Sequence, residues 1–189
     1  MRIVGGTLKG HSLAGPTGQG TRPTSDRVRE SIFNILAHGG ARIGIEGCRV
    51  LDVFAGTGAM GFEALSRGAR FCHFIDDDTA ARGVIRRNAD ALGVIGQCKI
   101  WRRDATRLGP CAPLPPFDLV FADPPYGKGL GSKALASLVS GGWFAPGAIL
   151  VVEEAKGAAL ALPPGVDIVD QRDYGDTQVV FLHAEENTP

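Results

Sequence analysis

Residues 49–61 read RVLDVFAGTGAMG, an apolar run that leads directly into a glycine-rich turn. The run Arg49–Phe54 is short, which predicts a buried strand, and Ala59–Arg67 has the apolar spacing of a helix. The glycines of the turn match the pattern GxGxxG, in which a helix N-terminus receives the polar part of a ligand. The stretch therefore predicts a strand–turn–helix unit. Its context favours a nucleotide-type ligand at the carboxyl end of the strand, although the glycine pattern by itself also fits a plain tight turn.

Strand and helix segments alternate through the rest of the chain. The further segments are strands at Phe71–Ile75, Lys99–Arg102, Phe117–Ala122 and Ala148–Glu153, helices at Thr79–Leu92 and Ser132–Val139, and a proline-rich loop at Leu108–Pro116. Repeated units of this length predict a doubly wound, Rossmann-like α/β fold, with a mostly parallel sheet and helices on both faces. Val166–Gln171 and Thr177–His183 lie too close for a helical crossover, so they are predicted to form an antiparallel hairpin.

The segment ahead of the first strand differs from the rest in composition. Residues 1–24 are rich in Gly, Pro and Thr, which predicts an arm or small hairpin, and residues 25–38 predict a leading helix with Ser25 as its N-cap. We expect residues 1–189 to form one domain. Residues 1–49 hold seven Lys and Arg against three Asp and Glu, although the whole chain has a net charge of zero. This basic end fits an anionic partner or a solvated face with no partner, and charge alone favours the solvated face.

Composition limits the classes of protein to consider. The 189 residues are 44% hydrophobic and 21% charged, a globular balance. The sequence has no run of 18 apolar residues and no apolar secretory signal, so we expect a cytoplasmic protein with no membrane contact. The four cysteines lie too far apart for a metal-binding knuckle, and we expect buried free thiols and no metal site.

Carboxylates follow or interrupt the predicted strands. Asp52 lies four residues before the first turn glycine and suits a ligand with an ammonium or sulfonium group, whereas a pyrophosphate would be repelled. The alternative is a buried Asp that caps local backbone. Asp76 is placed to accept hydrogen bonds from ribose hydroxyls, a role that fits NAD equally. Asp104 is placed either to reach an adenine amino group or to open a surface loop.

The turn Asp123-Pro124-Pro125-Tyr126 follows a predicted strand and is the most specific signal in the chain. Two consecutive prolines make the turn rigid. The carboxylate of Asp123 and the carbonyl of Pro124 are suited to accept both N–H bonds of an exocyclic base amine, and Tyr126 to stack on the base. A plain tight turn with an Asp cap is the alternative, and the position after a strand argues against it.

Together, DVFAGTG at residues 52–58 and DPPY at 123–126 resemble the class I S-adenosylmethionine-dependent amino-methyltransferases. Further blocks are similar to one family among them, the 16S ribosomal RNA guanine-N2 methyltransferases. These blocks are RIVGG at residues 2–6, KG at 9–10, TRPTSDRVRE at 21–30, FNIL at 33–36 and YGDT at 174–177. Two departures are an Asp at position 76, where the family commonly has Glu, and a less basic arm.

The resemblance implies direct methylation of the N2 amine of one guanine in 16S rRNA, with the rRNA held in the 30S subunit or an assembly intermediate. It implies S-adenosylmethionine as cofactor, bound by Asp52, Phe54, Ala55, Gly56, Thr57, Gly58, Asp76 and Asp104. It implies that Asp123, Pro124, Pro125 and Tyr126 hold the guanine, and that Arg2, Lys9, Arg22, Arg27 and Arg29 contact RNA phosphates.

Other functions remain open on the sequence alone. The chemistry of the DPPY turn also suits an amino-methyltransferase acting on adenine N6 or cytosine N4. A ribosome-assembly RNA-binding factor with a retained cofactor pocket is a non-enzymatic alternative. Asp52 and the DPPY turn disfavour an NAD-dependent dehydrogenase. Since the sequence has no sustained heptad pattern, we expect a monomer without an obligate protein partner.

Overall fold

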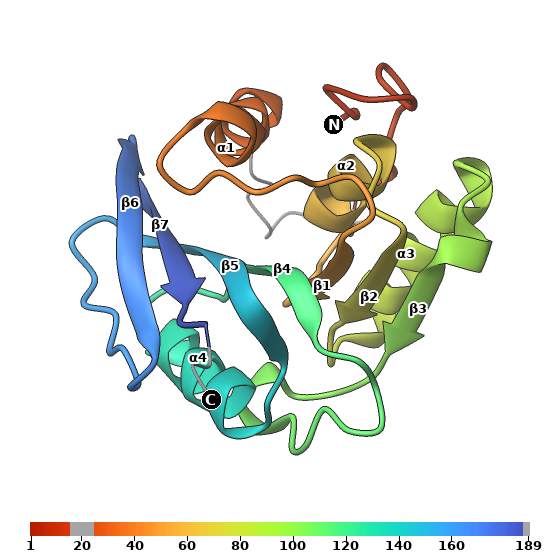
Figure 1. Cartoon of the computed structure of the whole chain (residues 1–189). Coiled ribbons are helices and arrows are strands. Elements are labelled where there is room, and N and C mark those ends of the chain that lie inside the picture. Colours follow the sequence, from red (N-terminus) through yellow and green to blue (C-terminus); the bar gives the residue numbers. More distant parts are fainter. Residues whose placement is uncertain (16–24, 187–189) are drawn as a thin grey trace.

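The computed structural model describes residues 1–15 and 25–186 and has a seven-stranded sheet at its centre, in the order β3-β2-β1-β4-β5-β7-β6 (Figure 1). The strands are β1 (Arg49–Val53), β2 (Phe71–Ile75), β3 (Cys98–Trp101), β4 (Phe117–Ala122), β5 (Phe144–Ala155), β6 (Val166–Tyr174) and β7 (Thr177–Ala184). The helices are α1 (Asp26–His38), α2 (Ala59–Ser66), α3 (Thr79–Ala91) and α4 (Leu130–Ser140), with short 3-10 turns η1 (Ile95–Gln97) and η2 (Ala105–Arg107).

The sheet is parallel from β3 to β5, and β7 runs antiparallel between β5 and β6. The predicted doubly wound sheet and antiparallel hairpin are thus confirmed. Residues 179–182 of β7 are apolar and buried without alternation, as expected for a strand covered on both faces, whereas most of β6 at the sheet edge is exposed.

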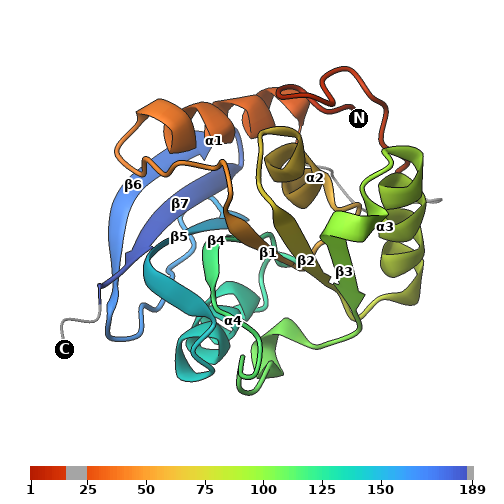
Figure 2. The same cartoon turned by 45° about the vertical axis from the view of Figure 1, so that its right-hand side comes forward.

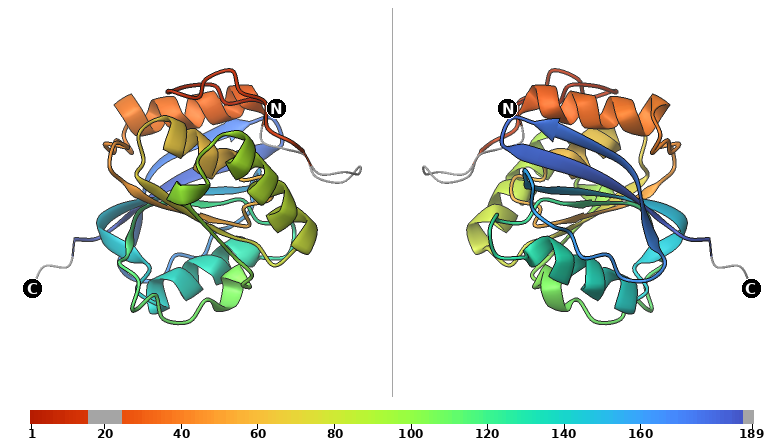
Figure 3. Two further views of the ribbon diagram at one scale, coloured as in Figure 1. Left: turned by 90° about the vertical axis from the view of Figure 1, so that its right-hand side faces the viewer. Right: turned by 90° about the vertical axis from the view of Figure 1, so that its left-hand side faces the viewer.

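Helices cover both faces of the sheet, as predicted. Figures 2 and 3 show α1, α2 and α3 on one face and α4 on the other. Along β1, Val50 faces the core beneath the first three helices, and Leu51 and Val53 face the core above α4. Among the described residues, no helix is both long enough and apolar enough to cross a membrane.

Element boundaries differ from the predicted ones mainly at β5. This strand begins at Phe144, before the predicted Ala148, because Phe144 pairs with Phe117 ahead of a shift in register. The shift places glycine and proline residues inside the strand, and such residues do not indicate a strand in the sequence. The segment from Leu108 to Pro116 is the predicted loop apart from one turn. Its Gly109 carbonyl accepts a hydrogen bond from Trp143 Nε1 at 2.8 Å.

The N-terminal residues fold back on themselves and lie on α2. Residues 1–15 contain a short hairpin in which Arg2 bridges Ser12 and the amide of Leu13 donates to the carbonyl of Met1. The amide of Val4 donates to Glu63 Oε2 at 2.9 Å, and the amide of Leu8 donates to Ser66 Oγ at 2.9 Å. The arm therefore uses backbone donors to attach to the helix that follows the glycine turn.

A buried ion-pair network joins α1, α2 and the arm. Ser25 caps α1 as the sequence predicts, since its hydroxyl accepts from the amide of Val28. Four residues later, Arg29 has 0% exposure. Arg29 Nε lies 3.4 Å from Glu63 Oε2, and its Nη2 donates to Asp26 Oδ1 at 2.8 Å. The same Nη2 donates to the backbone carbonyl of Arg2, and Glu63 is also paired with Arg67 at 2.8 Å.

This burial corrects the expectation that Arg29 contacts RNA phosphates. A guanidinium surrounded by two carboxylates and a carbonyl has its donors directed into the protein, and none of its surface reaches solvent. The resemblance implied RNA contact for both Arg27 and Arg29, and packing of Arg29 against the sheet was the alternative that the sequence left open. Two positions along a helix rotate a side chain by more than half a turn, which places one in solvent and the other against α2.

We predict that Arg29→Ala lowers the free energy of unfolding by about 3 kcal/mol, because it leaves the buried Glu63 without one of its cations. The matched change Arg27→Ala on the exposed face of the same helix should alter stability by less than about 0.5 kcal/mol. Urea unfolding of both variants measures the difference. Equal stability of the two variants would contradict the structural role given to Arg29.

Candidate active site

The parallel register brings the residues that follow β1, β2 and β4 into one row. Val53 pairs with Ile75 on one side and with Ala122 on the other. The next residues along these strands, Phe54, Asp76 and Asp123, therefore lie at the same edge of the sheet. The residues predicted to bind the cofactor and the residues predicted to hold the base thus come together at the carboxyl edge, as expected for an open α/β sheet.

The glycine turn at this edge has a restrained backbone. Phe54 has a φ of 55° and is the only non-glycine residue with positive φ among the described residues. Such a conformation costs about 1–2 kcal/mol for an L-residue, and it occurs where the surroundings hold the chain in place. Gly56 and Gly58 also have positive φ values, and a Cβ at Gly58 would lie 2.6 Å from the Phe62 ring. Glycine is therefore required in this turn.

Asp76 holds the turn from the neighbouring strand. Its Oδ2 accepts a hydrogen bond from the amide of Gly56 at 2.8 Å, and its Oδ1 accepts from the amide of Asp78 at 2.9 Å. The side chain is half-buried, and this desolvation raises the pKa of the Asp76 carboxyl above its ordinary value. Each oxygen uses one acceptor site on backbone and keeps another, so the carboxylate still has capacity to accept from a ligand's hydroxyls.

Asp52 lies beneath the turn and caps α2. It is 4% exposed, and its Oδ2 accepts from the amide of Gly61 in the first turn of that helix at 3.1 Å. Burial raises the pKa of Asp52 to about 8, and the nearby Asp76 charge adds to this effect. The contact is the backbone-capping arrangement that the sequence left open as an alternative to direct contact with a cationic ligand.

Gly61 is the third glycine of the pattern and serves packing between helix and sheet. A Cβ at this position would lie 2.4 Å from the ring of Phe74 and 2.5 Å from Cys72 Sγ on β2. Any larger residue would push α2 away from the sheet and weaken the contact between Asp52 and the helix amide. Cys72, like Cys48 and Cys111, is a buried free thiol, and Cys98 is a free thiol at intermediate burial.

Asp104 lies just beyond β3 and is exposed. Its Oδ1 accepts from the amide of Thr106 at 2.8 Å and from Thr106 Oγ1 at 2.7 Å, and these bonds lower the pKa of the Asp104 carboxyl. These bonds fit the loop-opening role that the sequence left open, and both use Oδ1, so contact with an adenine stays a prediction. Asp104 follows β3, which pairs with β2. The ends of these two strands are joined by a hydrogen bond of 3.2 Å from the amide of Asp76 to the carbonyl of Trp101.

The DPPY turn continues from β4, and its tyrosine is held by the hydroxyl. Tyr126 Oη donates to Glu153 Oε1 at 3.0 Å and lies 2.8 Å from Thr177 Oγ1. The sequence reasoning missed both partners as site residues. Glu153 follows Val152, which pairs with Ala122 just ahead of Asp123. A carboxylate at the end of a parallel strand was therefore an available signal, whereas the place of Thr177 depends on the hairpin's position in the sheet.

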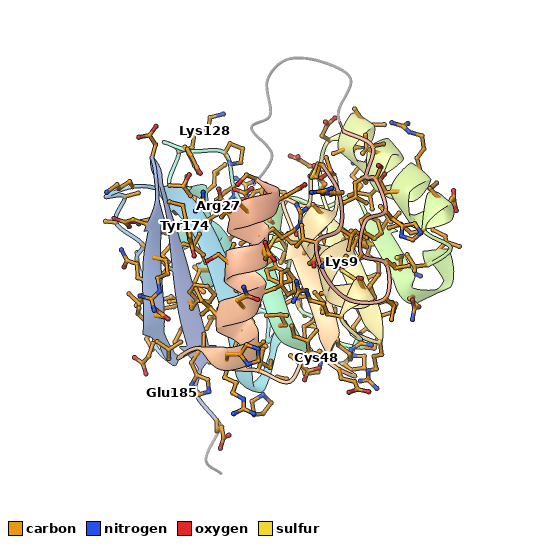
Figure 4. The ribbon with its side chains drawn as sticks, turned by 90° about the horizontal axis from the view of Figure 1, so that it is seen from above. Lys9, Arg27, Cys48, Lys128, Tyr174 and Glu185 are labelled. Carbon is orange, nitrogen blue, oxygen red and sulfur yellow. The ribbon has the colours of Figure 1, made fainter. Side chains whose placement is uncertain are left out.

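The cations predicted to contact RNA lie in different environments. Arg2, Lys9 and Arg27 are exposed, and Arg2 also pairs loosely with Asp26 at 3.8 Å. Arg22 lies outside the described residues. Figure 4 shows Arg27 on α1 and Lys128 in the loop after the DPPY turn toward the carboxyl ends of the parallel strands, whereas Cys48, which precedes β1, lies at the opposite end. Lys128 is an exposed cation that the sequence reasoning did not single out.

We predict a pH dependence of stability that Asp52 causes. Because its pKa is about 8 in the folded chain against an ordinary 3.8, the folded state binds the proton more tightly between these values. The stabilisation is complete below about pH 4 and is lost as the pH rises toward 8. Asp52→Asn keeps an oxygen acceptor for Gly61 and removes the ionisation, so its free energy of unfolding should fall less between pH 5 and pH 8 than that of the unchanged chain.

Urea unfolding at the two pH values measures this difference. The exposed Asp77 provides the matched control, since Asp77→Asn should leave the pH dependence as it is. The same decline in the Asp52→Asn variant as in the unchanged chain would show that Asp52 is ionised at neutral pH.

This chain is similar to known proteins over most of its length. The family model described as Conserved hypothetical protein 95 matches residues 1–183. Ribosomal RNA small subunit methyltransferase D of Haemophilus influenzae is 32% identical over 177 residues, covering 93% of this chain and 89% of the relative. The protein of the same name from Escherichia coli is 37% identical over 153 residues, covering 81% of this chain and 74% of the relative.

Solved structures give the same result for the fold. The protein yhhF from Escherichia coli has a TM-score of 0.84 to this chain at 32% identity, and the match covers 99% of each chain. The protein TTHA0928 from Thermus thermophilus has a TM-score of 0.74 at 26% identity, covering 98% of this chain and 99% of that structure. The fold is that of the class I methyltransferases. The chain belongs to the Conserved hypothetical protein 95 family, the family of ribosomal RNA small subunit methyltransferase D.

Proposed function

We propose that this protein transfers a methyl group from S-adenosylmethionine to the exocyclic N2 amine of a guanine in 16S rRNA. The observation that carries the proposal is the DPPY turn after β4, which shares a sheet edge with the glycine turn after β1. Relatives named ribosomal RNA small subunit methyltransferase D support rRNA as the substrate. Guanine N2 is the finer part of the proposal and rests on the sequence resemblance together with the chemistry of the turn.

The residues at the carboxyl edge fit S-adenosylmethionine. The turn has no side chain at Gly56, where an added Cβ would meet only the Phe54 carbonyl at 3.9 Å, so a ligand has room to approach the backbone. Asp76 has free acceptor capacity for ribose hydroxyls. In this proposal Phe54, Ala55, Gly56, Thr57 and Gly58 line the methionine part, Asp52 holds that turn from below, and Asp104 faces the adenine. When bound, the cofactor supplies an electrophilic methyl group on a sulfonium.

The turn residues activate and orient the amine. An exocyclic amine of a base is a poor nucleophile because its lone pair is delocalised into the ring. The carboxylate of Asp123 and the carbonyl of Pro124 accept its two N–H bonds and draw the lone pair out of the ring plane. Pro125 keeps these acceptors in place before substrate arrives, and the Tyr126 ring stacks on the base. Asp123 or water takes the proton that the amine loses.

Recognition of the RNA uses exposed cations of the N-terminal arm, of α1 and of the loop after the DPPY turn. Arg2, Lys9 and Arg27 are available for phosphate contacts, and Lys128 adds a charge close to the DPPY turn. Arg22, which lies outside the described residues, is proposed for the same role. The substrate is 16S rRNA within the 30S subunit or an assembly intermediate, where shape complements a modest number of charges.

Transfer of tritium from labelled S-adenosylmethionine tests the function, with nucleoside analysis of the product. The substrates are 30S subunits that lack the modification, naked 16S rRNA, 50S subunits and duplex DNA. We expect label in N2-methylguanosine from 30S subunits. Label in N6-methyladenine from DNA would replace the substrate class, and absence of label from every substrate, with tight cofactor binding, would favour an assembly factor.

We predict that Asp123→Ala lowers turnover by at least about 100-fold, because it removes one of the two acceptors for the reacting amine. Its affinity for S-adenosylmethionine should stay within a few-fold of the unchanged value. Asp77→Ala, a carboxylate removed at the same sheet edge after β2, should change neither quantity. If Asp123→Ala instead lost cofactor binding, Asp123 would be a cofactor ligand.

A further inference from the structure

Tyr126 combines an exposed ring with a fixed hydroxyl. Its relative exposure is 41%, and it is the only exposed large aromatic side chain among the described residues. An aromatic ring left in solvent usually rotates, yet the Tyr126 hydroxyl has two partners at 3.0 and 2.8 Å. The hydroxyl end of the side chain is thus restrained, although the residue as a whole is exposed.

The two partners of the Tyr126 hydroxyl come from different strands, and together they determine the direction of each hydrogen bond. A phenol has one proton, which Tyr126 donates to Glu153 Oε1, so Thr177 Oγ1 must donate its own proton to the phenol oxygen. Burial raises the pKa of Tyr126 to about 12, with the Glu153 and Asp123 charges adding to the shift. The phenol is therefore neutral at neutral pH, and this supports a role in position over a role as a phenolate base.

Thr177 lies in a part of the backbone that is held by neighbouring strands. It is the first residue of β7, is 9% exposed and pairs with Ala155 of β5 and Tyr174 of β6. The carbonyl of Asp176 accepts from the amide of Lys156 at 2.8 Å. A hydroxyl on such a support has little freedom to move, which is the requirement for holding another side chain accurately.

We propose that Thr177, together with Glu153, is a positioning residue that fixes the plane of the Tyr126 ring for stacking on the target base. The inference rests on the proposed function and adds residues to its site. A tyrosine ring fixed before the substrate arrives loses little conformational freedom on binding and presents one stacking angle. The residues that contact the base are then those of the DPPY turn, and Thr177 acts through Tyr126.

A double-mutant cycle in the methyl-transfer assay tests this role. Thr177→Val keeps the volume and removes the donor, and it should lower kcat about fivefold, the loss expected for one hydrogen bond. Tyr126→Phe keeps the ring and removes both bonds, so its loss should be larger, roughly tenfold. Adding Thr177→Val to Tyr126→Phe should cause no further loss, since the hydroxyl through which Thr177 acts is gone. Thr177→Ser should restore kcat, and cofactor affinity should not change in any variant.

Tyr174→Phe is the matched control. It also removes a phenol hydroxyl bonded to a hydroxyl, at the other end of the same turn. Its kcat should equal that of the unchanged chain. Equal losses in kcat for Tyr174→Phe and Thr177→Val, or additive losses in the double variant, would overturn the proposal in favour of general support of the fold.

A spectroscopic readout separates this inference from the proposed function. The chain has two tyrosines, so 3-fluorotyrosine labelling gives two ¹⁹F signals. Thr177→Val should shift or broaden the Tyr126 signal and leave the Tyr174 signal in place. If the unchanged protein methylates no rRNA, the proposed function fails and the stacking role fails with it. If the protein is active while Thr177→Val alters neither kcat nor the Tyr126 signal, only the positioning role is overturned.

Discussion

In-register parallel pairing of β2, β1 and β4 is the constraint on which the site depends. It places the residue after each strand at one edge, so that Asp76 reaches the amide of Gly56 at 2.8 Å across the strand boundary. That bond and the capping of α2 by Asp52 hold a turn that contains the positive φ of Phe54. The strain in the turn persists because acceptors on both sides specify one conformation.

A buried carboxylate also attaches the N-terminal arm and α1 to α2. Glu63 on α2 pairs with Arg29 and Arg67 and accepts the amide of Val4, so one side chain joins α1, α2 and the arm. Because α2 begins at the glycine turn, the helix that carries the exposed Arg27 is fixed relative to the proposed cofactor site. Figure 1 shows α1 and the N-terminal arm on the same side of the sheet as α2.

Local patterns in the sequence were sufficient to predict the architecture. Apolar runs followed by glycine or aspartate marked β1, β2 and β4, and the short interval between the last two strands marked the hairpin. The pattern was not sufficient for individual side chains. Whether Arg29 faces solvent depends on which side of α1 lies on α2, and whether Asp52 meets a ligand or the Gly61 amide depends on how close α2 approaches. Thr177 lies 51 residues from Tyr126 in the sequence and reaches it only because β7 pairs with β5.

The proposed function depends on binding of S-adenosylmethionine at the carboxyl edge of β1 and β2, with Asp76 as an acceptor for its hydroxyls. Calorimetric titration of the unchanged chain and of Asp76→Ala with S-adenosylmethionine and with NAD tests it most directly. We expect the unchanged chain to bind S-adenosylmethionine but not NAD, and Asp76→Ala to lose this binding. Binding of NAD, or undiminished affinity of Asp76→Ala for S-adenosylmethionine, would contradict it.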